Sequence, residues 1–324
     1  MITFLKLIRW KNILIIVITM FAMRYAVIAP VYTYFGIPVV LSKISFMFLV
    51  LSVIFLASAG NVINDYFDRR ADMINRPDNV LVVFSIRRRQ TIIIHAMFSI
   101  FGIICGFIVS NDIGKTFFGW FFIFAVIILW LYSANFKRRA LIGNITASFF
   151  VALIPFSVGI FEFYAVRNKF PYPTYETISA SEIALYMILG FSVFAFIYNF
   201  ILVVAKDCEN YEGDKLTGRK TIPVRIGKRK TNWILGFMSL ISVILVFLTL
   251  YLFLPKVFFL NNEKICVYYI FLFIIVPAFV MAIVSFVGTQ KRKYAAVEMM
   301  TKFIMLFGIL FSLIFNHVVY GFIQ

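Results

Sequence analysis

The chain has 324 residues, of which 63% are hydrophobic and 14% are charged, and 41 of them are phenylalanine. Soluble globular proteins are about 45–50% apolar, so this composition excludes a soluble globular fold and indicates a polytopic membrane protein. The net charge is +17 at pH 7, but topology and anionic lipid headgroups explain basic loops beside membrane helices. We therefore expect contact with membrane lipids and no nucleic-acid partner.

Nine apolar runs approach or exceed the roughly 18–20 residues that span a bilayer as a helix. They lie at residues 12–35, 44–63, 91–110, 116–134, 142–163, 183–205, 232–254, 265–288 and 295–322. Residues 1–324 are thus predicted to form a single all-α integral-membrane domain. The first run is long and lacks a small-x-small cleavage site, so we expect no cleavable signal peptide.

Lysine and arginine are distributed unevenly between the loops. The N-terminal segment and the loops after the second, fourth, sixth and eighth runs hold 23 of them, whereas the opposite loops hold six. Cytoplasmic loops carry the excess of positive charge in multi-pass proteins. The N-terminus is therefore predicted to face the cytoplasm and the C-terminus to face the outside.

Acidic and amide side chains cluster where the second apolar run meets a basic loop. Asn64, Asp68 and Asp72 recur every four residues, and a helix advances by about 3.6 residues per turn, so the three share one face. Carboxylate and amide oxygens are the ligands that Mg²⁺ prefers, and a bound Mg²⁺ favours a diphosphate. The alternative is that these acids only solvate a helix end beside arginines such as Arg76.

A second acidic loop follows the sixth apolar run. Asp207, Asn210 and Asp214 lie at positions i, i+3 and i+7, which again form one helical face. The two loops together hold eight of the chain's 14 acidic residues, whereas solvation alone would spread the acids over every loop. Because the acidic loops follow the second and sixth runs, we infer two four-helix units and a ninth helix, with both Asp-rich loops cytoplasmic.

Two cations allow more than one interpretation. Arg24 lies halfway along the first apolar run, where a cation is costly unless it faces a polar cavity or a partner. Arg24 therefore either contacts the substrate or pairs with another group inside the bundle. Lys137 follows the fourth run and is either a point charge for a diphosphate or a topological signal.

These motifs resemble those of the UbiA superfamily of intramembrane prenyltransferases, over nearly the whole chain. The family's first motif, N-x-x-x-D-x-x-x-D followed by N-R-P, is similar to residues 64–77. Its second motif, D-x-x-D-x-x-G-D followed by G-x-x-T-x-P, is similar to residues 207–223, and its Y-S/T-x-x-x-K segment resembles residues 132–137. Two positions depart from the pattern: Asn210 stands where a second Asp is usual, and Asp78 stands where another Arg is frequent.

The resemblance implies Mg²⁺-dependent transfer of a prenyl chain from an isoprenoid diphosphate to a lipid-like or aromatic acceptor. The metal ligands that it implies are Asn64, Asp68, Asp72, Asp207, Asn210 and Asp214, with Asp68, Asp72, Asp207 and Asp214 as the catalytic residues. The expected substrate contacts are Asn64, Arg76, Tyr132, Lys137, Lys206, Asn210 and Arg24.

The acceptor and the class of protein each have an alternative. Within the superfamily, the second motif is most similar to the branch that includes digeranylgeranylglyceryl phosphate synthases, and residues 7–12 are similar to bacterial chains of that kind. We therefore expect geranylgeranyl transfer to geranylgeranylglyceryl phosphate in a bacterial cytoplasmic membrane. The alternative acceptor is an aromatic quinone precursor. The alternative class is a cation or lipid transporter, but transporters place their acids near the midplane of the bilayer.

Overall fold

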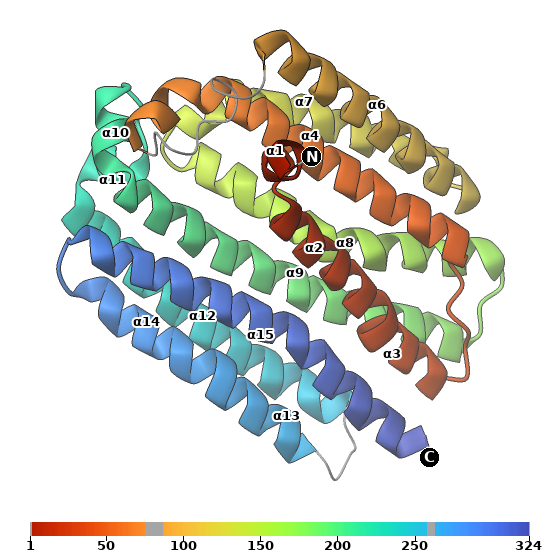
Figure 1. Ribbon diagram of the computed structural model, residues 1–324. Coiled ribbons are helices and arrows are strands. Elements are labelled where there is room, and N and C mark those ends of the chain that lie inside the picture. Colours follow the sequence, from red (N-terminus) through yellow and green to blue (C-terminus); the bar gives the residue numbers. More distant parts are fainter. Residues whose placement is uncertain (1, 76–86, 258–262, 324) are drawn as a thin grey trace.

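The computed structural model describes residues 2–75, 87–257 and 263–323 (Figure 1). Within these residues, nine helical segments are long and apolar enough to cross a membrane, which confirms the predicted number. The segments are α2 with η1 and α3 (Trp10–Ala22, Met23–Ile28 and Ala29–Tyr34), α4 (Lys43–Asn75), α6 (Arg88–Asp112), η3 with α7 (Thr116–Phe118 and Gly119–Ala134), α8 (Ile142–Lys169), α9 (Tyr175–Glu209), α12 (Lys228–Val257), α13 with η5 and α14 (Glu263–Ile270, Phe271–Ile275 and Val276–Phe286) and α15 (Lys291–Ile323). Each predicted apolar run falls on one of these segments.

The first and eighth spans are composite helices. In each, a π-helical turn, η1 or η5, is followed by an α-helix with a proline in its first turn, Pro30 in α3 and Pro277 in α14. Proline removes a backbone donor and clashes with the carbonyl four residues earlier, and a π turn relieves such a conflict without ending the helix. The spans therefore continue across the bilayer despite their prolines.

The helices pack as two groups, and the first span contacts members of both (Figure 1). In the first group α4 packs along α6 and α7, and in the second α9 packs along α8 and α12, while α12 packs along α14. The ninth span, α15, packs along α9 and α14 and also contacts η1 and α3 of the first span. The predicted all-α membrane fold is confirmed, and α15 packs on the second group and on the first span.

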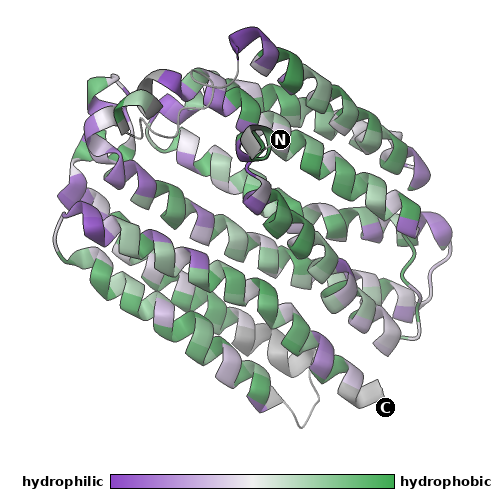
Figure 2. Ribbon diagram, viewed as in Figure 1, coloured by the Kyte–Doolittle hydropathy of each residue, from purple (hydrophilic) through white to green (hydrophobic). Residues whose placement is uncertain are grey.

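The outer faces of the spanning helices are apolar, as a lipid environment requires. On α12, for example, Ile244 is 64% exposed and Phe247 is 65% exposed. Figure 2 shows hydrophobic residues along the middle of the outer helices and hydrophilic residues around the short helices α10 (Tyr211–Leu216) and α11 (Ile222–Ile226). The C-terminal part of α4 lies beside α10, so the two predicted acidic motifs meet at this end of the bundle.

Candidate active site

The first motif places two polar side chains on the buried face of α4. Asn64 and Asp68 are 7% and 4% exposed, and they are one turn apart, as their spacing predicts. Asp72 lies one turn further along the same helix, and its side chain is outside the described part of the structure. Arg76 also lies outside the described residues.

Lys137 reaches this face from η4 (Phe136–Arg138), the short helix after α7. Its Nζ donates to Asn64 Oδ1 at 3.0 Å and forms an ion pair with Asp68 Oδ2. The start of α8 packs closely on this turn, because a Cβ on Gly143 would lie only 2.8 Å from the carbonyl oxygen of Phe136. Glycine at position 143 therefore allows the approach of the two elements.

Arg219 joins the two motifs. One guanidinium nitrogen, Nη2, donates to Asp68 Oδ1 at 2.5 Å, and Nη1 lies 3.6 Å from Asp214 Oδ1. The turn that carries Arg219 is fixed by Gly218, which has a φ of 70°, and by a hydrogen bond from the backbone N–H of Arg219 to the carbonyl oxygen of Asp214 at 2.9 Å. One side chain thus links α4 with the segment that follows α9.

Asp214 is buried beside this arginine, with an exposure of 3%. Burial raises the pKa of the Asp214 carboxyl above its ordinary value, although the positive charges of Arg219 and Lys137 oppose the shift. A buried carboxylate requires a cationic partner or a metal ion. Arg219 is such a partner.

Asp207 is held by α8 rather than by a cation. Asn144 Nδ2 donates to Asp207 Oδ2 at 2.8 Å. Asn144 is itself only 3% exposed, and its backbone carbonyl accepts a hydrogen bond from Ser148 Oγ at 2.7 Å. Asn199 on α9 lies next to Ser148, with its Nδ2 3.5 Å from Ser148 Oγ. Asp207, Asn144, Ser148 and Asn199 thus form a row of polar contacts between α8 and α9.

Three further predicted residues lie around this cluster. Tyr132 lies on α7, in the last turn before η4, which carries Lys137. Asn210 lies at the junction of α9 and α10, and its backbone carbonyl accepts from the N–H of Asp214 at 3.0 Å. Lys206 pairs with Glu298 of α15 at 3.7 Å, so the structure joins it to the last helix.

Arg24 lies far from the acidic residues of the two motifs. Its Nη2 donates to the carbonyl oxygen of Leu41 at 2.5 Å, and its guanidinium carbon is 4.5 Å from the centroid of the Phe46 ring. Phe46 and Asp68 are 22 residues apart on α4, or about 33 Å at 1.5 Å per residue. This placement supports the second interpretation of Arg24, a residue that pairs within the bundle.

The oxygen ligands at the cluster are of the chemical type that binds a magnesium ion. Asn64, Asp68, Asp207 and Asp214 offer amide and carboxylate oxygens, which are the hard ligands that Mg²⁺ takes. Among the described side chains, however, no group of three Asp, Glu, His or Cys residues lies close enough to hold a metal ion. In this structure Lys137 and Arg219 neutralise Asp68 instead.

Sequence reasoning did not select Arg219 or Asn144 as site residues. Arg219 stands inside the second motif, between Gly218 and Thr221, and Asn144 follows Gly143 at the start of the fifth span. In both cases the polar residue directly follows a glycine. Their partners lie in other helices, so the pattern alone does not indicate a role.

This fold and this site define a class of protein: a helical membrane bundle with paired Asp motifs at one end. The model of the UbiA prenyltransferase family matches residues 16–307. The chain therefore belongs to the UbiA prenyltransferase family. This membership confirms the predicted enzyme class, a prenyltransferase, over the alternative of a transporter.

Several curated relatives share one name. The chain is 31% identical to a digeranylgeranylglyceryl phosphate synthase from Pyrococcus horikoshii, over 67% of this chain and 69% of the relative. It is 32% identical to the protein of that name from Thermococcus gammatolerans, over 62% of this chain and 64% of the relative. A third, from Methanosphaera stadtmanae, is 26% identical over 78% of this chain and 80% of the relative.

Solved structures share the fold. A digeranylgeranylglyceryl phosphate synthase structure superposes with a TM-score of 0.60 at 19% identity, covering 97% of each chain. A UbiA homologue from Archaeoglobus fulgidus, solved with DMAPP and Mg²⁺, gives a TM-score of 0.55 at 19% identity, covering 96% of this chain and 99% of the homologue. At these identities the likeness establishes the fold alone.

Proposed function

We propose that this protein transfers a geranylgeranyl group from geranylgeranyl diphosphate to the free hydroxyl of geranylgeranylglyceryl phosphate. The observation that carries the proposal is the buried cluster in which Arg219 and Lys137 bind the carboxylate of Asp68 between the two motifs. The shared name of the curated relatives supports the choice of acceptor. In the reaction the bond between the allylic carbon and the diphosphate oxygen breaks, an ether bond forms, and the hydroxyl proton is released.

A divalent magnesium ion would be held by Asn64, Asp68, Asp72, Asp207, Asn210 and Asp214, and it would neutralise the leaving diphosphate. Lys137 and Arg219 hold Asp68 in place and keep further N–H donors at the same end of the bundle. Charge-assisted hydrogen bonds from such donors to phosphate oxygens are short and strong. These two residues therefore bind and orient the diphosphate, and Tyr132 is the neighbouring aromatic residue.

The proposal includes an orientation. The N-terminus and the acidic cluster face the cytoplasm, the C-terminus lies outside, and the chain is a multi-pass protein of a bacterial cytoplasmic membrane. The excess of lysine and arginine at the N-terminus and after the even-numbered spans supports this orientation. It also gives the acceptor's phosphate cationic partners at the membrane surface.

Incubation of the purified protein with geranylgeranyl diphosphate, Mg²⁺ and either geranylgeranylglyceryl phosphate or an aromatic acid tests the proposal. We expect an ether product that disappears when Mg²⁺ is chelated and when Asp68 is changed to Asn. Prenylation of the aromatic ring alone would overturn the proposed acceptor and leave the assignment as a prenyltransferase intact. An Asp68→Asn variant with normal activity would overturn the role of the cluster.

A further inference from the structure

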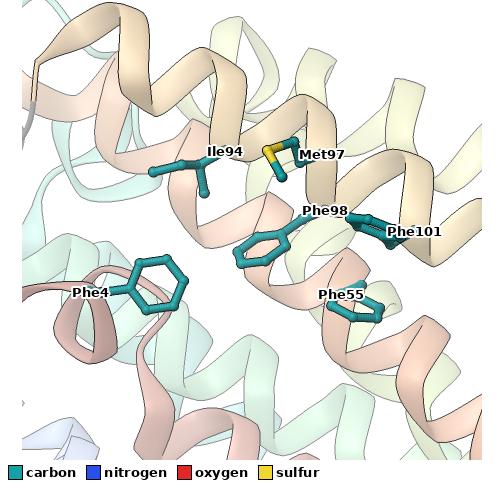
Figure 3. Close-up of a pocket in the computed structure, with 6 residues that line it drawn as sticks. All are labelled: Phe4, Phe55, Ile94, Met97, Phe98 and Phe101. Atoms are coloured by element: carbon teal, nitrogen blue, oxygen red, sulfur yellow. The ribbon is translucent and has the colours of Figure 1, made fainter. Parts of the chain in front are cut away.

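An apolar notch lies on the side of the bundle, between α1 (Ile2–Leu7), α4 and α6 (Figure 3). Its volume is about 250 Å³, and the side chains that line it are Phe4, Phe55, Ile94, Met97, Phe98 and Phe101. The ring of Phe98 is central, with its centroid 6.1 Å from that of Phe4 and 5.8 Å from that of Phe55. A surface lined by aromatic and aliphatic side chains suits a flexible hydrocarbon chain.

The position of α1 places Phe4 at the notch. Arg9 has a φ of 55°, which breaks the helix between α1 and α2. As a result, Figure 1 shows α1 nearly end-on while α4 and α6 run across the view. Leu7 is fully buried in a small cluster with Val62, and this contact fixes α1 against α4. Phe4 is thereby held over the notch from a helix that does not follow the bundle axis.

The notch is short enough to fit within one leaflet of a bilayer. Ile94 and Phe101 are seven residues apart on α6, which is about 10 Å at 1.5 Å per residue, and one leaflet contributes about half of the roughly 30 Å hydrocarbon core. Arg87 is the residue immediately before α6, seven residues before Ile94, and its backbone is extended (φ −72°, ψ 144°). It places a cation about 10 Å beyond the apolar lining.

The polar end of the notch carries surplus positive charge. Lys6 on α1 and Arg87 at the start of α6 are both exposed. The acidic neighbour on α4, Asp65, is already paired with Arg9 at 2.8 Å. An apolar chain in the notch and an anionic group beside Lys6 and Arg87 are therefore complementary to the surface.

We propose that the notch binds a chain of an anionic membrane lipid whose phosphate contacts Lys6 and Arg87. The occupant is a resident lipid of the bilayer and not a substrate. Each lysine or arginine near an anionic lipid surface contributes about fivefold in affinity. The site should consequently favour an anionic lipid over a zwitterionic one by at least about fivefold.

Quenching by brominated lipids tests this preference. A reporter tryptophan replaces Met97, which is 50% exposed in the notch, and a control tryptophan replaces Phe279, which is 52% exposed on α14. Both variants are placed in phosphatidylcholine vesicles that contain a minor fraction of brominated phosphatidylglycerol or brominated phosphatidylcholine. Fluorescence of the unsubstituted protein in the same vesicles is subtracted.

We expect brominated phosphatidylglycerol to quench the Met97→Trp reporter more than brominated phosphatidylcholine, and to quench the Phe279→Trp control no more than brominated phosphatidylcholine does. Ile94→Trp is the second reporter if Met97→Trp does not fold. Equal quenching by the two lipids in the notch, or the same preference at both sites, would overturn the proposal.

Charge variants test the headgroup contact. Lys6→Gln combined with Arg87→Gln should remove the preference for phosphatidylglycerol and leave quenching by phosphatidylcholine unchanged. The matched control, Lys291→Gln combined with Arg292→Gln, removes two exposed cations from the start of α15 and should keep the preference. A preference that survives the first pair of changes contradicts the assigned phosphate contact.

Discussion

Arg219 is the residue on which the two acidic motifs converge, since it contacts Asp68 and Asp214 together. Arg219→Gln should lower prenyl transfer by roughly 10²-fold, the usual loss when one preorganised donor is removed from an active site. Arg219→Lys should not restore activity, because a single ammonium cannot present the two-pronged geometry of a guanidinium. Transfer kinetics and thermal unfolding measure the two effects separately.

The control for this prediction is Arg229→Gln, which removes an exposed arginine from the first turn of α12. It should leave transfer unchanged. Wild-type activity in Arg219→Gln, or an equal loss in the control, would mean that Arg219 contributes only to the general positive charge of this end of the bundle.

Asn144 should act through Asp207. The change Asn144→Ala removes the donor to Asp207 Oδ2, and loss of such a supporting hydrogen bond behind a metal ligand costs about 10-fold to 100-fold in metal affinity or activity. We expect a higher Mg²⁺ concentration for half-maximal transfer. Thr146→Ala is the control, because its hydroxyl donates to the carbonyl oxygen of Ile142 in the same helix; an identical shift in both variants would contradict the prediction.

Local periodicity explains which site residues the sequence could predict. Asn64 and Asp68 share a face because their spacing matches one helical turn, and this property needs no tertiary information. The link from Arg219 to Asp68 and the link from Asn144 to Asp207 could not be found in this way, since these partners are 151 and 63 residues distant in the chain. Arg24 shows the same limit: its depth predicts a partner, but only the packing of residues 40–46 supplies one.

At the scale of elements, a buried acid connects the fifth span to the loop between the first two spans. Glu162 on α8 is 1% exposed, and its Oε1 accepts from the backbone N–H groups of Val40 at 2.6 Å and Leu41 at 3.2 Å. Arg24 donates to the carbonyl oxygen of Leu41. This network anchors the loop at the end of the bundle opposite the acidic cluster.

Glu162→Ala should destabilise the folded protein by about 1–3 kcal/mol for each of the two backbone N–H donors, of Val40 and Leu41, that it leaves without an acceptor. Activity per folded molecule should persist, since the site is about 30 Å away along α4. Denaturant unfolding in detergent micelles measures the stability. The control, Glu182→Ala, breaks an exposed 3.9 Å pair with Arg167 and should cost less than about 1 kcal/mol.

For the whole molecule, hydropathy predicted the existence of the nine spans, because each span needs only a continuous apolar length. It did not predict all their bounds, since α4 continues to Asn75 beyond the run 44–63 and α9 begins at Tyr175 before the run 183–205. The sequence could not show that α15 packs on both the second group and the first span, since this depends on contacts with α9, α14, η1 and α3. Nor could it show the notch, whose walls come from three separate helices.

The orientation of the bundle can be tested with two introduced cysteines at its opposite ends. Leu216, in α10 beside the acidic cluster, is 74% exposed, and Tyr172, between α8 and α9, is 97% exposed. The three native cysteines are buried, so the unsubstituted protein should react little. A membrane-impermeant maleimide should label Tyr172→Cys in intact cells and Leu216→Cys only in inside-out vesicles, because the basic loops that flank α10 are retained in the cytoplasm. The reverse pattern would place the acidic cluster outside the cell and would require the diphosphate donor to be supplied from that side.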